Sequence, residues 1–137
     1  MLVGAATTSK SPLVFLADRG HHRIQVFNVL TGEHVRSIGS QGSAAGQLSN
    51  PFGLAVLEAT PGSAQPAMLF VADFGNSRVQ VFDAESGEHI RCVGGSAGAA
   101  GGKLSRPICV SVQRGLDGAT LLFVTDQADN CIHVYVL

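Results

Sequence analysis

Short apolar runs separated by polar turns follow one another along this chain, and the same order of runs occurs three times. The middle copy, residues 69–93, reads LFVADFGNSRVQVFDAESGEHIRCV: a continuous apolar run, a turn, an alternating run, a second turn and a short final run. Residues 14–38 repeat this order, and residues 122–136 repeat its first part. Such self-similarity indicates a repeat architecture with one supersecondary unit per repeat.

Each run has the length and composition of a β-strand. Residues 13–17 are continuously apolar, which predicts a strand buried on both faces. Residues 23–28 alternate, which predicts a strand with one covered face. Residues 2–7 (LVGAAT) resemble residues 56–60 (VLEAT), so we expect a clipped strand there. The remaining predicted strands are residues 34–38, 52–57, 68–73, 78–83, 89–93, 108–113, 120–126 and 131–137.

The tight connections predict antiparallel neighbours, so each unit is expected to be a meander of four strands, A to D. Glycine-rich loops at residues 39–50 and 94–105 join the units. Four-stranded units repeated radially are typical of a β-propeller, and we predict an all-β, partial β-propeller with four-stranded antiparallel blades. The predicted blades are residues 1–46, 47–103 and 104–137, and the last lacks its fourth strand.

The composition indicates no strong attraction to nucleic acid or to a charged membrane. Only 14% of the 137 residues are charged, against about 25% in a typical globular domain, and the formal net charge is −1. No apolar run approaches the roughly 20 residues of a membrane helix. The start of the chain lacks the basic and apolar regions of a signal peptide, so we expect an intracellular protein.

Three cysteines, Cys92, Cys109 and Cys131, are an odd number and form no CxxC pair. They predict neither a disulfide framework nor a zinc site, and we expect small, half-buried strand residues.

One aspartate ends an apolar strand in each unit: Asp18, Asp73 and Asp126, at intervals of 55 and 53 residues. A residue that recurs in every repeat serves the repeat, so these carboxylates are expected to accept backbone N–H bonds and to pair with Arg23 or Arg78. In the turn after Asp18, Gly20 is expected to adopt a positive φ.

The repeated motif resembles that of the NHL-repeat propellers, in which an apolar strand ends in Ala-Asp and is followed by a polar turn and Asn-His-Arg-Ile-Gln-Val-Phe. The matching segments are residues 16–18 (LAD) with 21–27 (HHRIQVF) and residues 71–73 (VAD) with 75–82 (GNSRVQVF). The phrase between blades is similar to residues 46–48 (GQL) with 51–56 (PFGLAV). The third unit departs, with Cys131 in place of the arginine, His133 in place of the glutamine, and no glycine in residues 108–110.

The resemblance implies a fold and does not select among the family's functions. We expect a non-catalytic scaffold that binds a protein partner through loops on a rigid frame. In a meander the B–C and D–A connections lie on one face, so the loops at residues 18–22, 39–50, 73–77, 94–105 and 126–130 are expected to lie together. The candidate partner-binding residues in these loops are Arg19, His21, His22, Phe74, Asn76, Gln127 and Asn130.

Two alternatives come from other members of such families. Single-stranded RNA could bind the same face, as in NHL-domain ubiquitin ligases, although Phe74 is the lone aromatic residue in the B–C loops. A metalloenzyme fragment resembling the peptidylglycine-amidating lyase would use histidines such as His21, His22 and His133. The sequence contains no nucleophile or phosphate-loop motif, and we predict no catalytic residue, metal or cofactor. Nearly three blades cannot close a ring, so we expect either a piece of a longer propeller, which the missing fourth strand favours, or two copies of the chain that complete a six-bladed ring.

Overall fold

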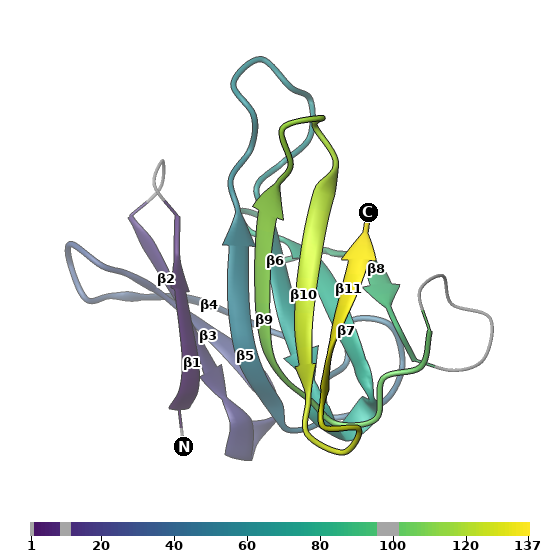
Figure 1. The fold of residues 1–137 in the computed structure, drawn as a ribbon. Coiled ribbons are helices and arrows are strands. Elements are labelled where there is room, and N and C mark those ends of the chain that lie inside the picture. The colour runs from purple at the N-terminus through teal and green to yellow at the C-terminus, as the bar shows by residue number, and fades with distance from the viewer. Residues whose placement is uncertain (1, 9–11, 96–101) are drawn as a thin grey trace.

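The chain folds into three antiparallel β-sheets (Figure 1). The computed structural model describes residues 2–8, 12–95 and 102–137. Within these ranges the only helical segments are the 3-10 turns η1 (Arg19–His21) and η2 (Phe74–Asn76), and no helix is long and apolar enough to cross a membrane.

Each sheet is a meander in which strands that are neighbours in sequence pair with one another. Sheet 1 contains β1 (Leu2–Thr7), β2 (Leu13–Asp18), β3 (Arg23–Asn28) and β4 (His34–Ile38). Sheet 2 contains β5 (Pro51–Leu57), β6 (Met68–Asp73), β7 (Arg78–Asp83) and β8 (His89–Val93). Sheet 3 contains β9 (Pro107–Arg114), β10 (Thr120–Asp126) and β11 (Cys131–Val136). The predicted strands are therefore present, with ends that differ by one residue at β2, β5, β9 and β11.

The prediction of a clipped first strand is wrong. Leu2 pairs with Asp18 in the way that Pro51 pairs with Asp73, so β1 matches β5 from its first residue and not from Val56 onward. The sequence suggested aligning residues 2–7 with residues 56–60 because both segments contain small residues. The pairing of β1 with β2 shows instead that Leu2 is equivalent to Pro51.

The sheets meet along their first strands. Strand β5 lies against β1 and β2 on one side and against β9 on the other, and β6 also contacts β9. Figure 1 shows β1, β5 and β9 side by side, with the later strands of sheet 1 turning away from those of sheet 3. The closest inter-sheet packing therefore lies at one edge of each sheet.

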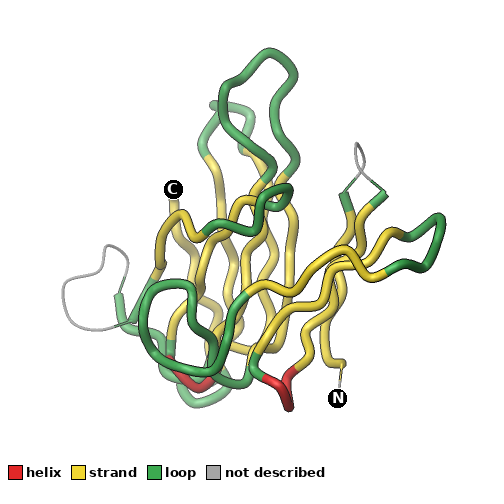
Figure 2. The backbone as a smooth tube through the Cα atoms, turned by 180° about the vertical axis from the view of Figure 1, so that it is seen from behind, coloured by secondary structure: helices red, strands yellow, loops and turns green. Residues whose placement is uncertain are grey.

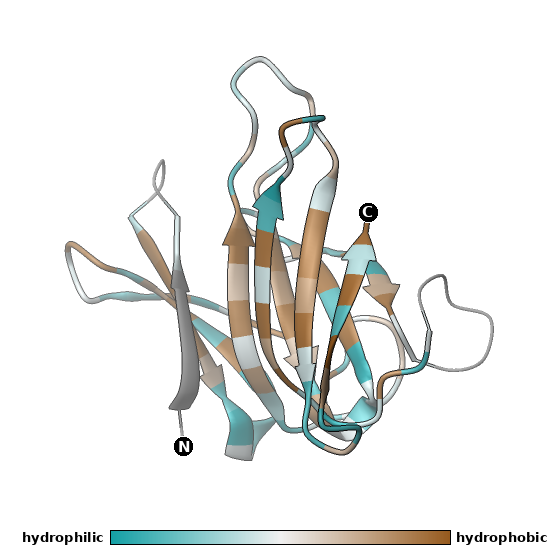
Figure 3. Cartoon of the chain, in the orientation of Figure 1, coloured by the Kyte–Doolittle hydropathy of each residue, from teal (hydrophilic) through white to brown (hydrophobic). Residues whose placement is uncertain are grey.

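Two apolar cores fill the spaces between the sheets. The core between sheets 1 and 2 includes Phe15, Ala17, Ile24, Val26, Leu69, Val71 and Phe82. The core between sheets 2 and 3 includes Phe70, Val79, Val81, Leu122, Val124 and Tyr135. Sheet 2 is thus covered on both faces, which explains why β6 reads as a nearly continuous apolar run (Figure 3) and why even the polar Gln80 of β7 is buried.

Sheets 1 and 3 each have a face with no neighbour in the described chain. Phe15 and Ala17 face the core, whereas Val14 and Leu16 lie on the opposite face of β2 and are only half-buried. The prediction that this strand is buried on both faces is therefore wrong for sheet 1, although it holds for β6.

On the outer face of sheet 3, Ile132 and Val134 are 64% and 56% exposed, while the equivalent Val79 and Val81 are fully buried. The three cysteines, expected to be half-buried, are free and exposed because they lie on outer strands or on this open face.

Candidate functional site: the polar turns and the loop end

The predicted loops do gather at one end of the sheets, where η1 and η2 lie (Figure 2). The amide of Asn50 donates to His22 Nδ1 at 3.0 Å, and the amide of Gly75 donates to the carbonyl of Ser49 at 2.8 Å. The Ser77 hydroxyl donates to the carbonyl of Ser105 at 2.7 Å. The first turn is therefore tied to the loop that enters sheet 2, and the second turn is tied to the loops that enter sheets 2 and 3. Residues 96–101 of the last predicted loop lie outside the described residues.

In sheet 2 the turn is organised around the buried carboxylate of Asp73. Arg78 Nε, Gln80 Nε2 and Asn76 Nδ2 donate to its Oδ2 at 2.9, 3.0 and 2.8 Å. The amide of Ser49 donates to Oδ1 at 2.7 Å. Arg78 also donates to carbonyl oxygens of the preceding loop, so the ion pair fastens that loop to the sheet.

Sheet 1 has a more open version of the same arrangement. Arg23 Nε and Gln25 Nε2 donate to Asp18 Oδ2 at 3.1 and 3.3 Å, and His21 Nδ1 lies 2.8 Å from Oδ1. The hydrogen bond with His21, supported by those from Arg23 and Gln25, holds the pKa of Asp18 below its usual value against the effect of desolvation. The aspartates thus do pair with the two arginines that the sequence indicated.

In sheet 3 the carboxylate of Asp126 is held by backbone groups instead. Its Oδ1 accepts from the amides of Arg106, Ala128 and Asp129, and its Oδ2 accepts from the amide of Ser105 at 2.7 Å. Desolvation raises the pKa of Asp126, but these backbone hydrogen bonds outweigh it, and the net pKa is lowered.

A left-handed residue ends each turn, and it is not a glycine. His22, Ser77 and Asn130 have φ values of 56°, 56° and 50°, whereas Gly20, expected to have a positive φ, does not. The glycine of the second turn answers a different need, because a Cβ at Gly75 would lie 2.9 Å from the carbonyl oxygen of Ser49. Close approach of the loop, invisible in the sequence, selects glycine there.

Two of the predicted partner-binding residues come together with a residue that the sequence did not single out. The Arg19 guanidinium lies 4.4 Å from the ring centre of Phe52 and 5.9 Å from that of Phe74. The two rings lie 5.2 Å apart. Arg19 Nε is buried and has no hydrogen-bond partner in the described part of the chain. We call Arg19, Phe52 and Phe74 the arginine–phenylalanine cluster.

The other predicted partner-binding residues lie outside the arginine–phenylalanine cluster, and most of them make contacts within the fold. His21 contacts Asp18, His22 accepts from Asn50, and Asn76 bridges Asp73 and the carbonyl of Gly42. Asn130 is the left-handed residue of the third turn, and Gln127 is exposed.

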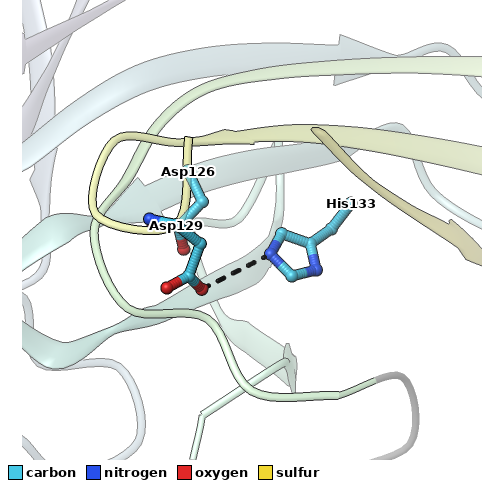
Figure 4. Close-up of side chains that lie close together, drawn as sticks. All are labelled: Asp126, Asp129 and His133. Atoms are coloured by element: carbon cyan, nitrogen blue, oxygen red, sulfur yellow. Dashed lines mark hydrogen bonds and ion pairs between the residues drawn. The ribbon is translucent and has the colours of Figure 1, made fainter. Parts of the chain in front are cut away.

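One group of potential metal ligands lies in the third turn. Asp126, Asp129 and His133 each offer a ligand atom, and these atoms lie within 4.8 Å of one another (Figure 4). Among the described residues this is the only such group, so His21 and His22 do not converge with His133. Asp129 was missed because its side chain meets His133 only after the hairpin closes.

A shallow cleft of about 330 Å³ opens elsewhere, between sheets 2 and 3. Met68, Ile90, Thr120 and Leu137 are among its lining residues, and none of the predicted site residues borders it.

No family model and no curated protein matches the chain. Among solved structures, the hydrazine synthase of Kuenenia stuttgartiensis is similar over all of this chain and 37% of its own, with a TM-score of 0.57 and 12% identity. U3-55K is similar over 98% of this chain and 36% of its own, with a TM-score of 0.51 and 18% identity. The chain therefore spans about a third of the length of these structures, and the likeness is one of fold.

Proposed function

We propose that the three sheets are blades of an NHL-type β-propeller and that the chain is a non-catalytic scaffold for a protein partner. Sheets that meet along their first strands and repeat one face-to-face packing are what radial blades require. The fold likeness to parts of two longer chains supports the proposal that this chain is a segment of a larger protein.

The arginine–phenylalanine cluster carries the functional part of the proposal. It joins a cation to two aromatic rings at the end where the loops gather, and all three residues are partly exposed. A guanidinium fixed over a ring offers a planar pair of donors to a carboxylate, beside apolar surface. The partner segment that fits is acidic, with an apolar side chain next to the acidic one.

A selection from a displayed random-peptide library against the purified chain tests this surface. Enriched peptides are expected to contain acidic residues, and Arg19→Ala or Phe74→Ala should weaken their binding about tenfold or more. Leu30→Ser is the matched control, because Leu30 is 81% exposed in the turn between β3 and β4, which is not part of the gathered loops. Peptides that bind the two variants as tightly as the original chain would contradict the proposal.

Single-stranded RNA is the competing ligand of the same surface. If RNA were the ligand, the chain would bind an unstructured RNA with an affinity that falls steeply as salt rises and that depends on Arg19. Such a result would replace the peptide assignment.

The outer faces of sheets 1 and 3 have the apolar residues that, in sheet 2, pack against neighbouring sheets. Val14, Leu16 and Phe27 on sheet 1 are equivalent to Leu69, Val71 and Phe82, which pack against a neighbouring sheet in the core. Ile132 and Val134 are equivalent to residues that receive such a neighbour. We propose that further blades cover both faces. A second copy of this chain would supply them in a six-bladed ring, and a discrete dimer in sedimentation velocity supports that form, whereas a monomer opposes it.

A further inference from the structure

The third turn replaces hydrogen-bond donors with metal ligands at three equivalent positions. Asp73 pairs with Arg78 and Asp126 pairs with Cys131 at the closing position of each hairpin, which aligns β7 with β11. In this register Asn76 corresponds to Asp129 and Gln80 corresponds to His133. Every side chain that donates to Asp73 in sheet 2 therefore has a counterpart in sheet 3 that can accept a proton or bind a metal.

The exchange also changes the charge of the turn. In sheet 2 the positive charge of Arg78 lies 2.9 Å from the carboxylate of Asp73. In sheet 3 a thiol stands at the position of the arginine, and Asp129 adds a second carboxylate. A divalent cation would supply the positive charge that the arginine provides in the other turn.

We propose that Asp126, Asp129 and His133 bind a divalent cation of the zinc type, with the Cys131 thiolate as the fourth ligand. Imidazole, carboxylate and thiolate are the ligands that zinc takes in proteins, usually four in a tetrahedron. Asp126 and Asp129 come from the end of β10 and the turn, whereas Cys131 and His133 come from β11, so the site clamps the hairpin closed.

The distances between ligand atoms suit this coordination. Ligands at the usual zinc distances in a tetrahedron lie about 3.4 Å from one another. His133 Nε2 lies 3.8 Å from Asp129 Oδ2 and 3.3 Å from Cys131 Sγ. The Cys131 thiol lies near His133 but outside the group of three converging ligand atoms, so its exposed side chain would have to turn toward the two carboxylates to complete the set.

The surroundings already orient the carboxylates. Asp126 Oδ1 is occupied by three backbone amides, while Oδ2 accepts only from Ser105 and keeps a lone pair for a metal. The Ser105 hydroxyl donates to Asp129 at 3.2 Å. Such outer hydrogen bonds fix the direction of metal-binding carboxylates. Asp129 and Cys131 are exposed, so a cation can enter from solvent.

Titration calorimetry with Zn²⁺ alone tests the site in the purified, reduced chain. One ion per chain is expected. Asp129→Asn and His133→Gln introduce the residues that sheet 2 carries at these positions, so they suit the fold, and each should weaken binding about tenfold or more. His89→Gln is the matched control, because His89 Nε2 lies 3.5 Å from the Cys92 thiol on strand β8, outside the group of converging metal ligands found among the described residues. It should leave the affinity unchanged.

Cobalt supplies a second readout that does not depend on partner binding. Co²⁺ bound in the same site should give visible absorption bands and a thiolate charge-transfer band, and Cys131→Ser should abolish the latter. Absence of bound metal, or binding that survives in Asp129→Asn and His133→Gln, overturns the site. A missing charge-transfer band overturns the role of Cys131. Peptide binding at the arginine–phenylalanine cluster fails or succeeds independently.

Discussion

Sheets 2 and 3 are built from the same strand pattern, yet they differ in what covers them and in what their turns hold. Phe70 is fully buried between two sheets, whereas the equivalent Phe123 faces outward and is half-buried. Asp73 is paired with an arginine, whereas Asp126 is held by backbone amides beside a second carboxylate. The comparison separates two effects. The type of a residue determines which interactions it can make, whereas the presence of a neighbouring sheet determines whether its side chain is buried.

The largest expected contrast concerns the two phenylalanines. Phe70→Ala should lower the free energy of unfolding by about 4 kcal/mol, because it leaves a cavity in the core. Phe123→Ala should cost about 1 kcal/mol, because half of the side chain already contacts water. Urea unfolding of the two variants measures both. Equal losses would mean that a further sheet covers the outer face of sheet 3 in solution.

A second contrast concerns the ion pairs of sheets 1 and 2. The side chain of Asp73 is fully buried and that of Arg78 is 13% exposed, so Arg78→Ala strands a buried charge and should cost about 3 kcal/mol. Arg23 is 39% exposed, and Arg23→Ala should cost about 1 kcal/mol or less. Thermal and urea unfolding compare the two. A larger loss of unfolding free energy in Arg23→Ala than in Arg78→Ala would show that the partly exposed ion pair of sheet 1 stabilises the fold more than the buried pair of sheet 2.

The approach of first strands gives a third test. A Cβ at Gly53 would lie 2.5 Å from the carbonyl oxygen of Ile108 and 2.8 Å from the Cα of Cys109, so Gly53→Ala must push β5 and β9 apart. We expect a loss of about 2 kcal/mol. Cys109 is the equivalent residue on the open side, and Cys109→Ala should change stability by about 0.5 kcal/mol at most. An unchanged Gly53→Ala would contradict the close packing.

The smallest effect is one of pH. The pKa of Asp126 is lowered in the folded chain from the usual 3.8, so its ionisation stabilises the fold above the unfolded value, and this contribution is lost as pH falls through the lower, folded value. Asp126→Asn should flatten the dependence of unfolding free energy on pH below about 4. An unaltered pH profile in metal-free buffer would show that the backbone amides do not favour the charged carboxylate.

The strands could be predicted from the sequence because the pattern of apolar and polar residues that indicates a strand lies within a few neighbouring positions. The change from continuous to alternating apolar residues located β6 and β7, and the repeated Asp-to-Arg spacing predicted the ion pair in sheets 1 and 2. The misaligned first strand and the positive φ assigned to Gly20 failed for the same reason. Register and turn geometry depend on pairing with distant strands and loops.

Only some residues of the candidate sites could be predicted from the sequence. The loops predicted to gather do so, and Arg19 and Phe74 were singled out, but Phe52 joins them only because β5 begins beside η2. Asp129 and His133 are four residues apart, and only the turn brings their side chains together.

By itself the amino-acid sequence determined the all-β class, the positions of the strands and the residues that close each turn, because these follow from patterns within a few neighbouring residues. Only the tertiary structure decided which equivalent residues are buried, which loop residues meet at a common surface and where carboxylates converge with an imidazole. Burial and convergence are properties of contacts between segments far apart in the chain, and such contacts exist only once the sheets have packed.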